Sequence, residues 1–220
     1  MKLQPLIAEL IGTFALVFFG SMSVSIFSGA GALGILPIAL AHGLALMIMV
    51  YSVGRISGAY VNPAVTIAML SLKKIGFTTA ILYIVFQLIG ASLAGFAHSQ
   101  ILTSASSSFY GLPQPTDMIG KSQFYAVIIE AILTFFLAFT ILNASSEISG
   151  FAIGMTLAAG ILIGGTLTGA ALNPARAFGP AIISGNFATQ WVYWLGPIAG
   201  ALIAGVIYKF LSANETTASK

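Results

Sequence analysis

Six long and almost uncharged stretches dominate this sequence. A helix needs about 20 mainly apolar residues to cross the hydrocarbon core of a bilayer, and each stretch has about that length. They cover residues of about 5–27, 35–54, 77–101, 123–142, 149–167 and 190–211. Two further apolar pieces, about 58–71 and 169–184, are too short to cross, and each has a proline near its start, Pro63 and Pro174. The pattern predicts an all-α membrane protein with six transmembrane helices and two shorter helical segments.

The composition excludes most other classes of protein. Only 6 % of the 220 residues are charged, against roughly 25 % in soluble domains, which excludes a soluble domain, a disordered chain and a nucleic-acid binder. Cysteine is absent, so disulfides, thiolate metal sites and cysteine nucleophiles are excluded as well. The sequence has no metal-ligand cluster, Ser/His/Asp arrangement or phosphate-binding loop. We therefore expect no metal, no cofactor and no enzymatic activity.

The placement of Lys and Arg predicts the orientation, because cytoplasmic loops carry an excess of these residues. With both termini in the cytoplasm, six basic residues fall inside and two outside. Those inside are Lys2, Arg55, Lys73, Lys74, Lys209 and Lys220, and those outside are Lys121 and Arg176. The opposite orientation would reverse the ratio. We expect a multi-pass protein of the cell membrane with both termini in the cytoplasm.

The sequence contains an internal repeat. Glu9-x-x-x-Thr-Phe returns as Glu130-x-x-x-Thr-Phe, and Asn62-Pro-Ala returns as Asn173-Pro-Ala. Three spans in each half place the second half upside down relative to the first, an inverted repeat of the kind found around pathways through membranes. We expect one transmembrane domain over residues 1–220, with repeat 1 at about 1–101, an outside linker at about 102–122, repeat 2 at about 123–211 and a cytoplasmic tail at 212–220.

Each Asn-Pro pair predicts the start of a short helix. Asparagine is a preferred N-cap, and proline suits the first turn, where its missing N–H would be unpaired anyway. Inverted symmetry brings the helices that begin at Asn62 and Asn173 in from opposite faces, so that their N-termini meet near the midplane. Irregular backbone at that depth must be buried in protein or line a wet cavity. Two positive helix ends aimed at one point repel cations.

These features together resemble the aquaporin, or major intrinsic protein, family. The resemblance rests on the doubled Asn-Pro-Ala, on its second copy with Arg176, and on the two Glu-x-x-x-Thr-Phe spans, and it covers nearly the whole chain. It implies six tilted helices and two re-entrant half-helices around one pore per subunit of a homotetramer. It also implies that the Asn62 and Asn173 amides donate hydrogen bonds to passing water, and that Glu9 and Glu130 orient the half-helix loops. The carbonyl ladder along the pore would come from Gly58, Ala59, Tyr60, Gly169 and Ala171.

The same resemblance implies a narrow selectivity ring, which maps by motif spacing to His42, Ile161, Ala170 and Arg176. Glycerol-conducting members usually carry an aspartate directly after the arginine, where this chain has Ala177. That position, with Ala181 and the pair Tyr193-Trp194, resembles the water-selective branch. Strict water channels usually have phenylalanine at the position of His42, and many have histidine at that of Ile161. The ring therefore looks closer to that of plant vacuolar members that also pass ammonia or other small neutral solutes.

Several polar residues inside the spans have competing interpretations. Arg176 could belong to a structural ion pair, but only Asp117 supplies an acid outside, so we interpret Arg176 as a pore-lining donor. Charged residues at membrane depth are functional by default. Glu9 and Glu130 could form a proton relay, although we favour carboxylates that accept backbone N–H bonds. His42 could be a packing residue, and His98 we expect to be structural or near the outer mouth.

Three classes of function compete. A secondary transporter also contains inverted repeats and intramembrane carboxylates, but it would drive a substrate uphill. A structural junction protein would pair membranes and conduct no water. The sequence favours the third class, a passive channel for water and small neutral solutes such as ammonia that excludes protons and ions. Its expected partners are the lipid bilayer and further copies of itself, with no nucleic acid.

Overall fold

The computed structural model describes residues 2–102 and 108–218. Part of the predicted linker and the last two residues of the predicted tail, with Lys220, lie outside the described residues. The described part is all-helical and contains no strand, which confirms the predicted fold class. Its α-helices are α1 (Leu3–Phe27), α2 (Ile35–Ser57), α3 (Pro63–Ser71), α4 (Phe77–Ile101), α5 (Gln123–Asn143), α6 (Ser149–Gly164), α7 (Pro174–Ser184) and α8 (Gln190–Ala218), joined in part by the 3-10 segments η1 (Ser28–Gly34), η2 (Ser108–Gly111) and η3 (Asp117–Ile119).

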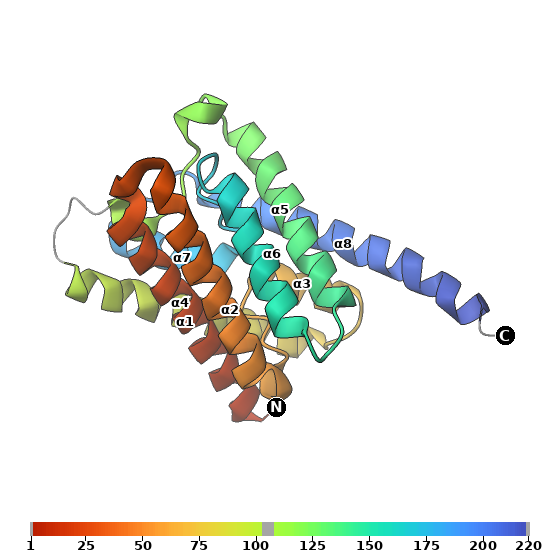
Figure 1. The fold of residues 1–220 in the computed structure, drawn as a ribbon. Helices are drawn as coiled ribbons and strands as arrows, with labels where there is room; N and C mark the ends of the chain where they lie inside the picture. Colours follow the sequence, from red (N-terminus) through yellow and green to blue (C-terminus); the bar gives the residue numbers. More distant parts are fainter. Residues whose placement is uncertain (1, 103–107, 219–220) are drawn as a thin grey trace.

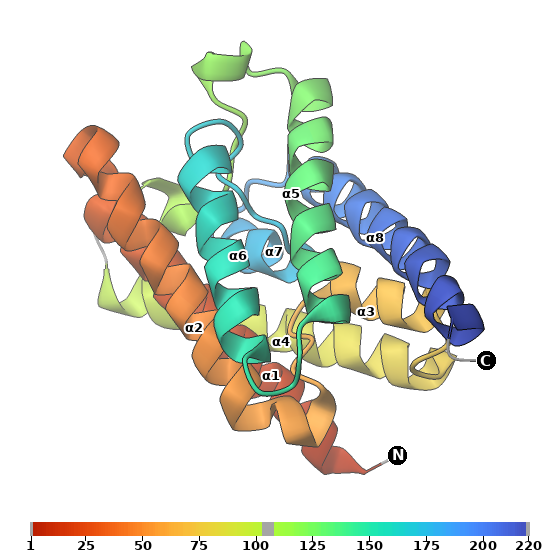
Figure 2. The same ribbon diagram turned by 45° about the vertical axis from the view of Figure 1, so that its right-hand side comes forward.

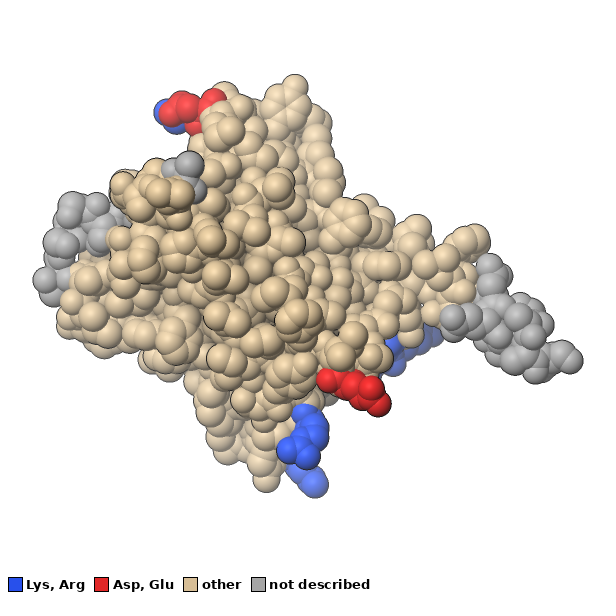
Figure 3. Space-filling view, viewed as in Figure 1, with Lys and Arg blue, Asp and Glu red and all other residues tan. Residues whose placement is uncertain are grey.

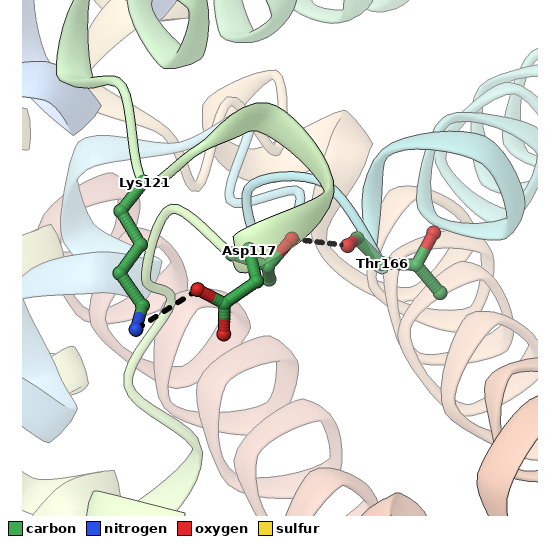
Figure 4. A network of polar contacts seen from close by, with 4 residues as sticks. Asp117, Lys121 and Thr166 are labelled. Atoms are coloured by element: carbon green, nitrogen blue, oxygen red, sulfur yellow. Dashed lines mark hydrogen bonds and ion pairs between the residues drawn. The ribbon is translucent and has the colours of Figure 1, made fainter.

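Five of these helices, α1, α2, α4, α5 and α8, are long and apolar enough to cross a membrane. Helix α6 has 16 residues, or about 24 Å at 1.5 Å per residue, and it ends three residues before the predicted span does. The linker binds two carbonyls just beyond its end. Thr116 donates its hydroxyl to the carbonyl of Thr166 (2.6 Å; Figure 4) and its N–H to that of Leu167 (2.9 Å).

The inverted repeat is visible in the packing of the helices. Helix α1 packs against α4 in the first half as α5 packs against α8 in the second, and α2 and α6 join the halves. Each short helix packs on a long helix of the opposite half, α3 on α8 and α7 on α4. The two short helices therefore lie among the long ones (Figures 1 and 2).

Small residues let the paired helices approach closely. A methyl group added at Gly90 of α4 would collide with the carbonyl of Leu10 in α1, and one added at Gly200 of α8 would collide with that of Ala131 in α5. Close approach of this kind is the usual way for helices to associate in lipid, where burial of apolar side chains gives no driving force.

The outer surface suits a bilayer. Large hydrophobic side chains such as Phe19, Phe96 and Phe136 point outward and are more than half exposed. On the face drawn in Figure 3, the charged side chains gather towards the ends, and the band between them carries none. The apolar band and the helix lengths together place the chain in the membrane as a multi-pass protein.

Candidate functional site

The two short helices begin at the predicted asparagines and point their N-termini at each other. The side-chain oxygen of Asn62 accepts from the N–H of Ala64 (2.9 Å), and that of Asn173 from the N–H of Ala175 (2.9 Å). Both asparagines have extended backbone and are followed by proline at the first helical position. These are the N-caps that the sequence predicts.

The two half-helices are joined by a reciprocal pair of hydrogen bonds. The Asn62 amide donates to the carbonyl of Leu172 (2.8 Å), which precedes Asn173, and the Asn173 amide donates to the carbonyl of Val61 (2.8 Å), which precedes Asn62. Each primary amide has two N–H groups, so each keeps a second one beside this bond. Both asparagines line the same cavity.

The loop before each asparagine has the same unusual backbone. In the first loop Gly58, Ala59 and Val61 have positive φ angles of 93°, 47° and 44°. In the second loop the equivalent residues Gly169, Ala170 and Leu172 have φ angles of 81°, 42° and 52°. Non-glycine residues adopt this left-handed region at a cost in energy and hold it only where the surroundings impose it.

Glu9 holds the first loop. Its carboxylate is fully buried and accepts four hydrogen bonds, from the hydroxyl of Ser57 (2.6 Å), the amide of Gln87 (2.7 Å) and the N–H groups of Tyr60 (3.0 Å) and Val61 (2.7 Å). Two of these donors are backbone groups with no partner in a helix. The carboxylate therefore replaces the missing helical acceptors and fixes the strained loop.

Glu130 holds the second loop in the same way. It accepts from the hydroxyl of Thr168 (2.6 Å) and from the N–H groups of Ala171 (3.0 Å) and Leu172 (2.8 Å). A buried tyrosine closes each loop from behind, Tyr83 bonded to the Ser57 carbonyl and Tyr193 to the Thr168 carbonyl. The sequence predicted both carboxylates at these loops, but it did not single out Ser57, Gln87, Thr168 or Tyr83.

Two cavities meet at Arg176. The inner cavity is lined by both asparagines, His42, Tyr60 and Arg176, and the outer cavity by Gly111, Pro113, Ile161, Gly169 and Arg176. The inner cavity leaves about 30 Å³ open to the centres of water-sized molecules, against about 190 Å³ for the outer one. The inner cavity, at the two asparagines, is therefore the narrower of the two.

His42 and Arg176 face each other at the junction of the cavities. The Arg176 Nε donates to His42 Nε2 (3.4 Å), and His42 Nδ1 lies 2.8 Å from the carbonyl of Ile38. The Ile38 carbonyl can only accept, so we assign the imidazole proton to Nδ1. A methyl group at Gly20 would collide with the imidazole ring, so this glycine makes the room that His42 occupies.

The other two predicted ring positions lie beside them. Ile161 is 1 % exposed and lines the outer cavity next to Arg176. Ala170 is also 1 % exposed, and it lies between Gly169, which lines the outer cavity, and Ala171, which lines the inner one. Of the predicted ladder residues, Gly58, Ala59 and Tyr60 line the inner cavity with Ala171.

Among the described residues, the Arg176 guanidinium is held by the linker and forms no ion pair with an acid. Its Nη1 donates to the carbonyl of Gly111 (2.9 Å) in η2. Asp117 instead pairs with Lys121 (3.0 Å), and both side chains are largely exposed (Figure 4). The role of Gly111 has no signal in the sequence, because it depends on where the linker folds back over the helices.

A buried amide pair where two re-entrant half-helices meet, inside a bundle with an inverted repeat, defines a membrane channel. The chain belongs to the major intrinsic protein family, whose model matches residues 1–208.

Similar proteins include both aquaporins and glycerol facilitators. The chain is 37 % identical over 220 residues to the probable aquaporin NIP4-2 of Arabidopsis thaliana, covering 96 % of this chain and 76 % of the relative. It is 39 % identical over 221 residues to the glycerol uptake facilitator protein-like 6 of Lactiplantibacillus plantarum, covering 97 % and 100 %. Among solved structures, the aquaglyceroporin of Plasmodium falciparum matches with a TM-score of 0.77 at 26 % identity and 94 % coverage of both chains. The family is one of channels for water or small solutes and not of enzymes.

Proposed function

We propose that this channel conducts water and small neutral solutes such as ammonia, and that it excludes protons and ions. The observation that carries the proposal is the reciprocal bonding of Asn62 and Asn173. Each amide donates one N–H to the opposite loop and keeps its other N–H for the cavity. A water that accepts from both amides turns its own hydrogens away from the midplane, which interrupts a chain of donors along which a proton could move.

The helix ends add an electrostatic barrier at the same place. Each half-helix N-terminus carries a positive partial charge of roughly half an elementary charge, and α3 and α7 bring two of them together. The buried charge of Arg176 lies where the cavities meet. A neutral solute carries no net charge and meets no such barrier, whereas a cation is repelled by all of these charges.

The ring of His42, Ile161, Ala170 and Arg176 sets the solute range in this proposal. Ile161 and Ala170 give it an apolar wall, and Arg176 supplies donors. The Nε2 of His42 carries a lone pair that a permeating donor can share with Arg176, and phenylalanine has no such acceptor. Ammonia is small and can donate its three N–H groups. The ring therefore suits ammonia better than a larger polyol.

A glycerol facilitator is the second candidate, because the Lactiplantibacillus plantarum relative carries that name. The residue after the ring arginine counts against it. Ala177 is fully buried among Ala126, Val192 and Tyr193, and its carbonyl accepts from the Gln190 amide (3.0 Å). The aspartate usual in glycerol-conducting members would have to fit into this apolar packing. We therefore rank glycerol below water and ammonia.

The remaining functional assignments form part of the same proposal. Glu9 and Glu130 act as the loop-orienting carboxylates, and the loop carbonyls act as the ladder. The protein works as a homotetramer in the cell membrane with both termini in the cytoplasm. The ends of α1 and α2 that carry Lys2 and Arg55 then face the cytoplasm, and Lys121 faces outward.

Stopped-flow measurements on proteoliposomes test the proposal directly. Water, ammonia, glycerol and urea are compared in the same vesicle preparation, with empty liposomes as the reference. We expect fast water flux without an ion gradient, ammonia flux above the reference, and glycerol flux far below water flux. Glycerol flux equal to that of water would establish the second candidate, and flux that needs a proton gradient would refute a passive channel.

A further inference from the structure

His98 is a buried histidine that the proposed pathway does not use. It lies near the end of α4 and is 0 % exposed. Its Nδ1 is 3.0 Å from the hydroxyl oxygen of Ser21 in α1, and its Nε2 has no hydrogen-bond partner among the described residues. The Ser21 hydroxyl also lies 3.5 Å from the Phe18 carbonyl, so its shorter contact is the one with His98. A buried imidazole with one open nitrogen is costly, and its retention calls for a reason.

The imidazole of His98 packs on the linker. The ring of Tyr110 meets it edge to face, with centroids 5.5 Å apart and planes at 88°. This is the favoured geometry for two such rings. Tyr110 belongs to η2, which also packs against α1 and α7. His98 therefore stands between the transmembrane helices and the linker segment that lies over them.

The backbone of that segment is strained. Phe109 and Tyr110 are consecutive non-glycine residues with positive φ angles of 47° and 57°, and each costs energy in this region. The next residue, Gly111, has a φ of 75° and lies so close to α1 that an added methyl group would be 2.9 Å from the Ser21 Cα and carbonyl oxygen. A strained turn keeps this shape only where contacts hold it, and His98 and Ser21 provide them.

The strained turn presents one group to the pathway. The carbonyl of Gly111 accepts from Arg176 Nη1 at 2.9 Å, and Gly111 lines the outer cavity together with Arg176. The other side-chain bond of Arg176 goes to His42. The guanidinium is thus held by two hydrogen bonds, one to His42 and one to the Gly111 carbonyl. The second bond depends on the position of the strained turn.

We propose that His98 is a positioning residue: with Ser21 it seats Tyr110, and through the adjacent Gly111 carbonyl it sets the place of the Arg176 guanidinium. The inference rests on the proposed role of Arg176 in the selectivity ring. When His98 no longer holds Tyr110, Arg176 keeps its charge and its bond to His42. Its Nη1 group is then free to move towards the outer cavity. The ring then widens for larger solutes, while the asparagine pair and water conduction stay intact.

The test compares His98→Leu with wild type in proteoliposomes and reads the glycerol-to-water permeability ratio. Leucine keeps the bulk of the side chain but removes the hydrogen bond at Nδ1 and the ring contact. We expect the ratio to rise by about threefold or more, on the scale of one lost ring contact and hydrogen bond, with water flux within a few fold of wild type. His98→Asn retains a hydrogen-bonding group near Nδ1 and should restore part of the selectivity. Ser92→Ala, on the same helix with its hydroxyl bonded within the helix to the Leu88 carbonyl, is the matched control and should leave the ratio unchanged.

Variants of Tyr110 test the same His98–Tyr110 contact from the linker side. They replace the first test if His98→Leu does not assemble. Tyr110→Ala should raise the ratio as His98→Leu does, whereas Tyr110→Phe keeps the ring and should behave as wild type. Because both residues act through one contact, the double variant His98→Leu/Tyr110→Ala should show no larger ratio than either single variant. Effects that multiply in the double variant would refute the shared contact.

Arg176→Val distinguishes a failure of this inference from a failure of the ring. If Arg176→Val changes the ratio and the His98 and Tyr110 variants do not, His98 is not a positioning residue and the ring assignment stands. If Arg176→Val also leaves the ratio unchanged, the ring assignment fails and the inference falls with it. A loss of water, glycerol and ammonia flux in equal proportion would mark His98 as merely structural.

Discussion

Replacing Arg176 by valine should make the channel leak protons and cations. Arg176 is 3 % exposed and lines both cavities, so an ion passing from one cavity to the other must come close to its guanidinium. Two unit charges about 4 Å apart repel by roughly 4 kcal/mol at an effective dielectric constant near 20. Since about 1.4 kcal/mol is a factor of ten, removal of the charge alone is worth up to about 10³ in ion flux.

The measured leak should be smaller than that limit. The N-termini of α3 and α7 keep their partial charges in the variant, and the backbone N–H of Arg176, which points at Asn173, is not changed by the substitution. We therefore expect an increase of at least tenfold and below about 10³-fold. Water flux should remain, because Asn62 and Asn173 are bonded to each other's loops and not to the guanidinium.

The assay uses proteoliposomes that contain a pH-sensitive dye and carry a potassium diffusion potential. Proton influx is divided by the water permeability of the same preparation, which corrects for the number of functional channels. Arg176→Lys is the control, because lysine keeps the positive charge but replaces the fork whose Nη1 and Nε bind Gly111 and His42 by a single ammonium. It should retain proton exclusion while the solute ratios shift. Proton flux unchanged in Arg176→Val, or raised equally in Arg176→Lys, would refute the electrostatic reasoning.

Three further results are expected. His42→Phe removes the acceptor for Arg176 Nε and should lower the ammonia-to-water permeability ratio with water flux within a few fold; an unchanged ratio would remove His42 from the ring. Mercuric ion should not inhibit the wild-type channel, which has no cysteine, whereas Ala170→Cys should create an inhibition that a thiol reverses; a resistant variant would place Ala170 outside the pore wall. Glu130→Gln puts an amide nitrogen opposite a buried backbone N–H, so unfolding should become easier by about 1–3 kcal/mol in thermal denaturation. Glu147→Gln, at an exposed carboxylate, is its control, and equal losses in the two would contradict the role given to Glu130.

The membrane fold and the two half-helices follow from local features of the sequence. The lengths of the apolar stretches are local properties, and a bilayer leaves a stretch of about 20 apolar residues few alternatives to a helix. The starts of α3 and α7 are also local, because Asn-Pro supplies a capping oxygen and a fixed φ within two residues. The resemblance to the family then implied that Glu9 and Glu130 lie beside these loops, and both carboxylates accept hydrogen bonds from the loop N–H groups.

The contacts that hold the site come from packing between distant parts of the chain. Arg176 is bonded to Gly111, 65 residues away in the sequence, and His98 to Ser21, 77 residues away. The turn after α6 is bonded in the same way by Thr116 in the linker. No periodicity or capping motif predicts such contacts, because they arise from the path of the linker over the bundle. The sequence could name Arg176 as a donor facing the pore, but only the packed linker shows which carbonyl orients it.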